Sequence, residues 1–170
     1  MNSVDKGAGW ISSPIYLTTD DEIKIRWMGG WDENRGGEVT ALDTPFTVTA
    51  GGPNMKVPTN GMYVVAYVPE TEEIAITSWF WGLIGDFNGW SGDVFMMYRG
   101  NGEWVAYDQT LPGGWKIRQG CSWDVNRGGT FVEAGTPFDA VPGGDNINVG
   151  DLTGFTVIYN QENETITVVK

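Results

Sequence analysis

The sequence predicts an all-β protein that consists of two antiparallel β-sandwich domains in tandem. Short stretches in which apolar and polar residues alternate are separated by Gly-rich turns, as in RGNGE at 99–103. No stretch of ten or more residues has a convincing helical period. A segment near the start of the chain also recurs in its second half, which indicates two copies of one domain.

The internal repeat is clearest around two basic strands. IKIRWMGGWDENRGG (23–37) and WKIRQGCSWDVNRGG (115–129) share nine of fifteen positions at a constant offset of 92. The offset also links TPF at 44–46 with TPF at 136–138. Both copies close with an acidic turn and a final strand. We therefore predict a domain at 1–78 (repeat 1) and a domain at 79–170 (repeat 2).

Repeat 2 begins with a segment that repeat 1 lacks. WGLIGDFNGW (81–90) has no counterpart, whereas GNGEWVAYDQTL (100–111) is loosely matched by GAGWISSPIYL (7–17), which pairs Trp104 with Trp10. The first domain is thus expected to lack its opening strand, either because the sequence begins inside a domain or because the first copy is naturally short of that strand. A sandwich without one strand has an open sheet edge, which we expect the neighbouring domain or another chain to cover.

The composition excludes several classes of function. Acidic residues outnumber basic ones 22 to 10, and the net charge of -12 disfavours nucleic acid and anionic membranes as partners. The absence of histidine removes His-based catalysis and the common zinc sites, and the single Cys121 excludes an intramolecular disulfide. We predict no cofactor and no metal. The polar start is not a signal peptide, so any export signal or anchor is expected outside this chain.

The repeated basic strand predicts a ligand-binding face. Lys116 and Arg118 alternate with apolar residues, so their side chains lie on one face of a strand, roughly 6–7 Å apart. Trp123, Asn126 and Arg127 follow in a Gly-rich loop. A sugar ring stacks its C–H face on an indole and bonds its hydroxyls to such donors. Repeat 1 carries the equivalent residues Lys24, Arg26 and Trp31.

Each of these residues also has a purely structural interpretation. Trp123 and Trp31 are equally suited to a domain core, and the Lys–Arg face to an ordinary solvated strand surface. Asp124 is better suited to a turn than to a ligand. Arg127 is a possible partner for Asp124.

The loop GDFNGW (85–90) adds a further aromatic residue. Its glycines allow a tight turn, so Trp90 is expected at an exposed tip. Asp86, Asn88 and Asp93 suggest calcium as an alternative, but the spacing lacks a full set of ligands.

Catalysis is not expected. Paired carboxylates hydrolyse glycosides without histidine, and Glu70, Glu72, Glu162 and Glu164 recur in the two copies. They lie in turns before the last strand of each copy, where solvated acids are common, and nothing in the sequence suggests a deep cleft. We therefore predict a protein that is not an enzyme.

These motifs resemble the carbohydrate-binding domains of the SusE/SusF outer-membrane starch-binding lipoproteins. The resemblance rests on WGLIGDFNGW, NGEWVAYDQTLPGGWKIR, SWDVNRGG and FTVIYNQENETITV, and it covers 79–170 and the repeated part of 1–78. It implies two tandem immunoglobulin-like β-sandwiches on the cell surface of a Gram-negative bacterium. It also implies non-catalytic binding of starch or maltooligosaccharide, with other outer-membrane glycan-uptake proteins as partners.

The resemblance also assigns roles to residues. Trp90 and Trp123 would be the stacking platforms, Lys116 and Arg118 the donors, and Asn126 a lesser contact. The family often has an aromatic residue where this chain has Arg127 and Arg35, which leaves a uronic acid or another glycan open. The alternative function is a structural spacer or interaction module whose sugar sites have degenerated.

Overall fold

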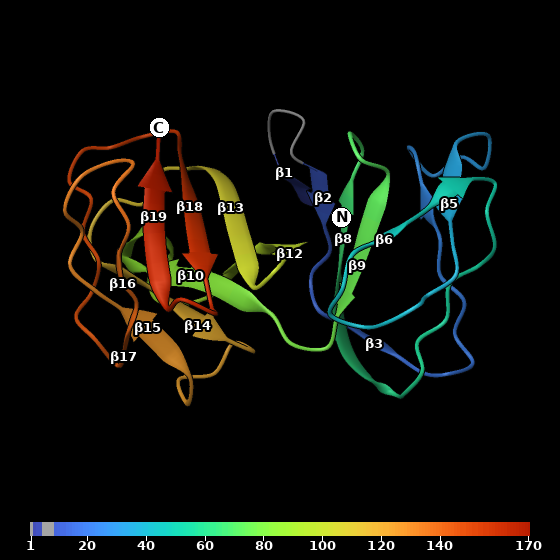
Figure 1. Ribbon diagram of the computed structural model, residues 1–170, viewed down its shortest axis with the longest axis horizontal. Coiled ribbons are helices and arrows are strands. Elements are labelled where there is room, and N and C mark those ends of the chain that lie inside the picture. Colours follow the sequence, from blue (N-terminus) through green and yellow to red (C-terminus); the bar gives the residue numbers. More distant parts are fainter. Residues whose placement is uncertain (1, 5–8) are drawn as a thin grey trace.

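The computed structural model describes residues 2–4 and 9–170, and these form an all-β structure. The 3-10 turn η1 (Asp86–Asn88) interrupts a succession of short strands. Figure 1 shows the strands in two groups that lie side by side along the long axis, one from each half of the chain. Among the described residues, no helix is long and apolar enough to span a bilayer.

Repeat 2 contains two five-stranded antiparallel sheets. The first has, in spatial order, β11 (Val94–Phe95), β10 (Trp81–Gly85), β14 (Trp115–Gln119), β15 (Asn126–Gly128) and β17 (Val141–Pro142). The second has β12 (Met97–Gly100), β13 (Glu103–Gln109), β18 (Phe155–Asn160), β19 (Thr165–Val169) and β16 (Phe138–Asp139).

Repeat 1 contains a larger and a smaller sheet. The larger one has β1 (Asn2–Val4), β2 (Gly9–Ile11), β8 (Gly61–Val68), β9 (Glu73–Thr77) and β6 (Phe46–Thr47), with β3 (Ile15–Leu17) also pairing with β8. The smaller one has β4 (Ile25–Arg26), β5 (Asn34–Gly36) and β7 (Thr49–Ala50).

The two repeats share one strand order. The sheet β4-β5-β7 corresponds to β14-β15-β17, and β1-β2-β8-β9-β6 corresponds to β12-β13-β18-β19-β16. The sequence predicted that repeat 1 lacks one strand, but the described residues 2–4 and 9–170 hold no counterpart of either β10 or β11. The first two residues of the loosely matched segment 7–17 lie outside the described part.

The boundary between 78 and 79 stays a prediction, as does the immunoglobulin-like type of the sandwiches. In each strand pairing, both strands lie on the same side of that boundary. The hydrophobic core of repeat 2, however, also contains Ile11, Val64, Ala66 and Val68 from repeat 1. The two repeats therefore pack against each other through apolar side chains.

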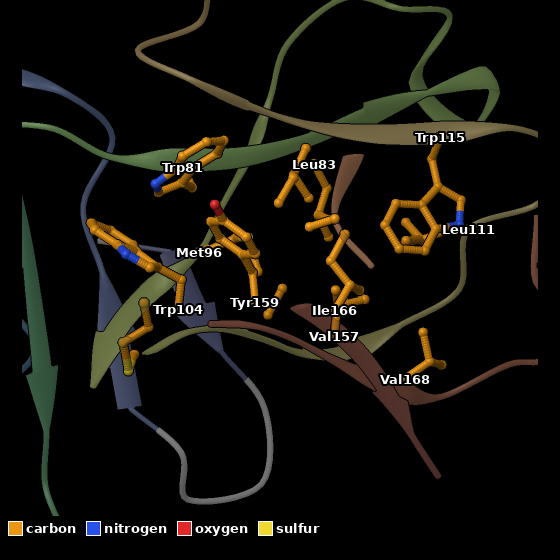
Figure 2. Close-up of a cluster of buried hydrophobic side chains, with 14 of the residues drawn as sticks. Trp81, Leu83, Met96, Trp104, Leu111, Trp115, Val157, Tyr159, Ile166 and Val168 are labelled. Carbon is orange, nitrogen blue, oxygen red and sulfur yellow. The ribbon is translucent and has the colours of Figure 1, made fainter. Parts of the chain in front are cut away.

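Three tryptophans form much of the core of repeat 2. Trp81, Trp104 and Trp115 are at most 3% exposed, and Trp81 contacts the Tyr159 ring edge-on at 4.7 Å between centroids (Figure 2). Strand β14 explains part of this, because its alternation places Trp115 and Ile117 inward at 0% exposure. Other tryptophans lie outside the buried core: Trp27, Trp31, Trp79 and Trp123 are each at least 45% exposed.

Candidate functional site

The loop after β10 holds Trp90 in a defined position. One carboxylate oxygen of Asp86 accepts a hydrogen bond from Trp90 Nε1 at 2.8 Å, and the other accepts one from the Gly114 amide at 2.7 Å. These two bonds, the Gly114 bond above all, lower the pKa of Asp86. Trp90 has a φ of 58°, a left-handed conformation that is uncommon for a bulky residue. Such backbone strain is typical of functional positions.

Trp90 and Trp123 form an inclined aromatic pair. Their ring centroids are 5.9 Å apart, and the ring planes are inclined by 39°. Trp123 is 47% exposed, and Trp90 is half-buried. The exposure of Trp123 excludes the alternative that it belongs to the domain core. The same holds for Trp31, which is 64% exposed. The expectation of an exposed Trp90 was wrong, because its ring packs against Trp123, and it is Trp123 that presents an open indole surface to solvent.

Arg118 supports this pair from a buried position. It is only 9% exposed and makes a two-pronged ion pair with Asp93, at 2.8 Å through Nε and 2.5 Å through Nη2. The hydrogen bond to Asp93 raises the pKa of Arg118. The guanidinium carbon lies 4.8 Å from the centre of the Trp123 ring. Arg118 thus holds the indole by a cation–π contact, and Asp93 engages two of the nitrogens that we expected to bond a sugar.

The position of the Asp93 side chain explains why residue 82 is a glycine. A Cβ at Gly82 would lie 2.8 Å from the Asp93 Cβ, closer than van der Waals contact allows. Gly82 also pairs with Arg118 across β10 and β14. A side chain at this position would therefore push Asp93 away from Arg118.

Lys116 and Asn126 connect the strand to the aromatic loop. Lys116 Nζ donates to Asn126 Oδ1 at 3.3 Å, and Asn126 Nδ2 donates to the Trp123 carbonyl at 3.0 Å. Repeat 1 reproduces this network, with Lys24 bonding Asn34 at 2.9 Å and Asn34 bonding the Trp31 carbonyl at 2.8 Å. The repeated Lys and Asn therefore shape the loop that presents the indole. They also leave further N–H groups of Lys116 for a ligand.

Arg127 does not join this group. It bonds both carboxylate oxygens of Glu164, at 2.6 and 2.9 Å, and its guanidinium carbon lies 5.5 Å from the centre of the Trp81 ring. The suggested partner Asp124 was wrong, because Asp124 bonds Ser122 within the loop. In repeat 1, Arg35 bonds Glu72 at 2.9 Å. The constant offset between Glu72 and Glu164 was the sequence signal for these pairs.

Because of the Arg127–Glu164 ion pair, we expect the stability of the fold to decrease in acid. Arg127 lowers the pKa of Glu164 from its ordinary value of 4.5, while burial raises the pKa of the neighbouring Tyr159 to about 12. A depressed carboxylate pKa stabilises the fold fully above the ordinary value, and this stabilisation is lost as pH falls through the depressed value. Since Glu164 is 44% exposed, we expect a modest contribution of about 1 kcal/mol.

Urea unfolding of wild type and Glu164→Gln at pH 7 and pH 2.5 measures this contribution. The variant should be less stable by about 1 kcal/mol at pH 7, and the difference should become smaller as the pH is lowered to 2.5. An equal difference at both values would show that the charge of Glu164 does not stabilise the fold.

Repeat 1 presents only part of the same arrangement. The guanidinium carbon of Arg26 lies 4.8 Å from the centre of the Trp31 ring, as in repeat 2. Arg26 is nevertheless exposed, has no carboxylate partner within the described part of the chain, and no residue matches Trp90. A single indole, without a second ring and with an arginine that is not held by a carboxylate in the described residues, makes the weaker platform of the two.

The calcium alternative finds no support in the geometry. Asp86 bonds Trp90 and Gly114, and Asp93 bonds Arg118. The side chain of Asn88 accepts from the Gly85 amide at 3.1 Å and donates to the Gly92 carbonyl at 2.5 Å. All three side chains stabilise the loop around Trp90.

Comparison with protein-family models and with curated proteins gives no match to this chain. The chemistry of the site is therefore interpreted from its own residues. These are an inclined indole pair held by an Asp–Arg ion pair, beside an ammonium group and an amide.

Proposed function

We propose that repeat 2 binds a polysaccharide without catalysing its breakdown. The observation that carries this proposal is the Trp90–Trp123 pair, with ring centroids 5.9 Å apart and Trp123 47% exposed, next to the Lys116–Asn126 donors. An indole surface accepts the C–H face of a sugar, and the neighbouring N–H groups bond its hydroxyls. Trp90, Trp123, Lys116 and Asn126 are the proposed contacts, and Arg118 is a positioning residue.

A starch-type α-glucan is the favoured ligand. Rings inclined by 39° suit a chain that curves, as an α-glucan does, better than a flat ribbon that needs coplanar rings. The uronic-acid alternative rested on Arg127 and Arg35, and these cations pair with Glu164 and Glu72. The net charge of -12 also disfavours an anionic polymer.

The cellular setting follows from the resemblance to SusE/SusF proteins. The proposed place is the outer membrane of a Gram-negative bacterium, beside other proteins of glycan uptake.

A spacer or interaction module is the second candidate function. Within residues 2–4 and 9–170 one edge of β4 is uncovered, which favours this function because an uncovered sheet edge is a place where another strand can pair.

Native gel electrophoresis in gels that contain starch, xyloglucan, inulin or pectin tests the proposal. Wild type should be retarded by starch, and Trp90→Ala should migrate close to its position in a gel without polysaccharide. Trp79→Ala is the matched control, because Trp79 is 45% exposed but lies outside the site. Retardation by another polysaccharide alone would overturn the ligand, and no retardation in any gel would overturn the binding function. Release of reducing sugar from the retarding polymer would overturn the non-catalytic assignment.

A further inference from the structure

Repeat 1 has a pocket that the sequence did not predict. It has a volume of about 500 Å³ and is lined by apolar side chains such as Trp10, Ile25 and Trp27, together with Tyr67 and the Arg35–Glu72 pair. It lies at the outer edge of β4, the strand that has no neighbour on that side within residues 2–4 and 9–170. An unpaired edge therefore coincides with an unfilled pocket.

The same place in repeat 2 is filled by strand β10. By the constant offset of 92, Tyr67, Arg35 and Glu72 correspond to Tyr159, Arg127 and Glu164. Trp81 of β10 lies against these residues, 4.7 Å from the Tyr159 ring centroid and 5.5 Å from the Arg127 guanidinium carbon. Figure 2 shows Trp81 beside Tyr159 and Trp104 in this core. The pocket of repeat 1 thus has the walls that hold Trp81 in repeat 2.

Side-chain exposure in the two repeats shows what the missing strand covers. Trp104 is 1% exposed, while its counterpart Trp10 is half-buried, and Tyr159 is 0% exposed against 8% for Tyr67. Trp10 pairs with Tyr67 across the strands as Trp104 does with Tyr159, so the register is the same. The difference in burial arises where β10 is absent.

Trp27 does not replace the absent strand. Its ring contacts Trp10 edge-on at 5.5 Å, but Trp27 remains 53% exposed and its neighbour Met28 88% exposed. Repeat 2 has the small or polar residues Gln119 and Gly120 at these positions. Two large apolar side chains beside an open sheet edge favour contact with a further polypeptide segment.

We propose that repeat 1 is completed by an extended polypeptide segment from outside residues 2–4 and 9–170, which adds to the edge of β4 as an antiparallel strand. The segment has the pattern aromatic, Gly, aliphatic, aliphatic, Gly, as in Trp81–Gly85. Its aromatic side chain enters the pocket between Tyr67 and Arg35. Backbone hydrogen bonds supply affinity in this mode of recognition, and the pocket supplies specificity. The inference does not depend on glycan binding.

The register of the added strand follows from repeat 2. There Trp81 is opposite Gln119, Leu83 opposite Ile117 and Gly85 opposite Trp115. Transferred by the offset, the aromatic residue is opposite Trp27, the first aliphatic residue opposite Ile25, and the final glycine opposite Ile23. A second copy of this chain is the less suitable donor, because all five residues of its own β10 are buried.

The test uses the full chain and a synthetic peptide with the sequence of residues 78–86 followed by a lysine tail. Hydrogen exchange is followed in segment 23–27, with the equivalent segment 115–119 as internal control because β10 already covers it. The peptide should slow exchange at 23–27 and leave 115–119 unchanged. A peptide in which the residue equivalent to Trp81 is alanine should bind at least tenfold more weakly.

Four outcomes would overturn the proposal. One is no change at 23–27 at saturating peptide, and another is equal binding of the alanine peptide. Slower exchange at 115–119 would show strand exchange in repeat 2 instead. Protection of 23–27 that grows with protein concentration in the absence of peptide would identify a second copy as the occupant. Because starch gels report on Trp90 in repeat 2, failure of either proposal is visible separately.

Discussion

Trp123→Ala is expected to weaken binding of a maltooligosaccharide about 5- to 150-fold. Stacking on an aromatic ring contributes about 1–3 kcal/mol by analogy with nucleic-acid bases, and 1.4 kcal/mol corresponds to a factor of ten. Trp123 carries the open half of the pair with Trp90, and its side chain is 47% exposed, so its removal should not disturb the core. Isothermal titration calorimetry with maltoheptaose measures the loss.

The matched control for this substitution is Trp31→Ala. Trp31 has the same Arg contact at 4.8 Å and the same Asn bond to its carbonyl, but it has no second ring beside it. We expect a change in affinity of less than about twofold. An equal loss for Trp31→Ala would place binding in both repeats, and unchanged affinity of Trp123→Ala would refute the site.

Asp93→Ala is expected to destabilise the protein by about 3–5 kcal/mol. The side chains of Asp93 and Arg118 are 2% and 10% exposed, and removal of one partner of a buried ion pair leaves the other charge uncompensated. Chemical denaturation followed by tryptophan fluorescence measures the change in unfolding free energy.

A double-mutant cycle separates the ion pair from simple loss of packing. In Asp93→Ala/Arg118→Met no charge remains buried, so the double variant should be more stable than Asp93→Ala alone. Additive losses in the two single variants would show that the two side chains do not interact energetically. Because Arg118 supports Trp123, the double variant should also bind glycan more weakly even where it is folded.

The internal repeat and the alternation of apolar and polar residues made much of the fold predictable. Trp115 and Ile117 face inward and Lys116 outward, as the strand pattern indicated. Arg118 was predicted on the correct face, but not as a buried group, because its partner Asp93 lies 25 residues away in the sequence. No local pattern relates residues so distant.

The sequence predicted which residues gather at the candidate site, but not which partner each of their side chains bonds. Trp123, Trp90, Lys116 and Asn126 lie close together, and their role as sugar contacts stays a prediction. Arg127 follows Asn126 directly in β15, and neighbouring side chains of a strand point to opposite faces. Its bond to Glu164 follows from this geometry, although the sequence had suggested a partner within the loop.

By itself, the sequence determined the all-β class and the duplication, because these depend on periodicity and on repetition along the chain. Tertiary structure alone decided which tryptophans are exposed and which cations are paired. It also decided that the absence of β10 leaves a pocket in repeat 1. The physical reason is that burial and ion pairing depend on residues brought together from distant parts of the chain, whereas strand formation depends on neighbours along it.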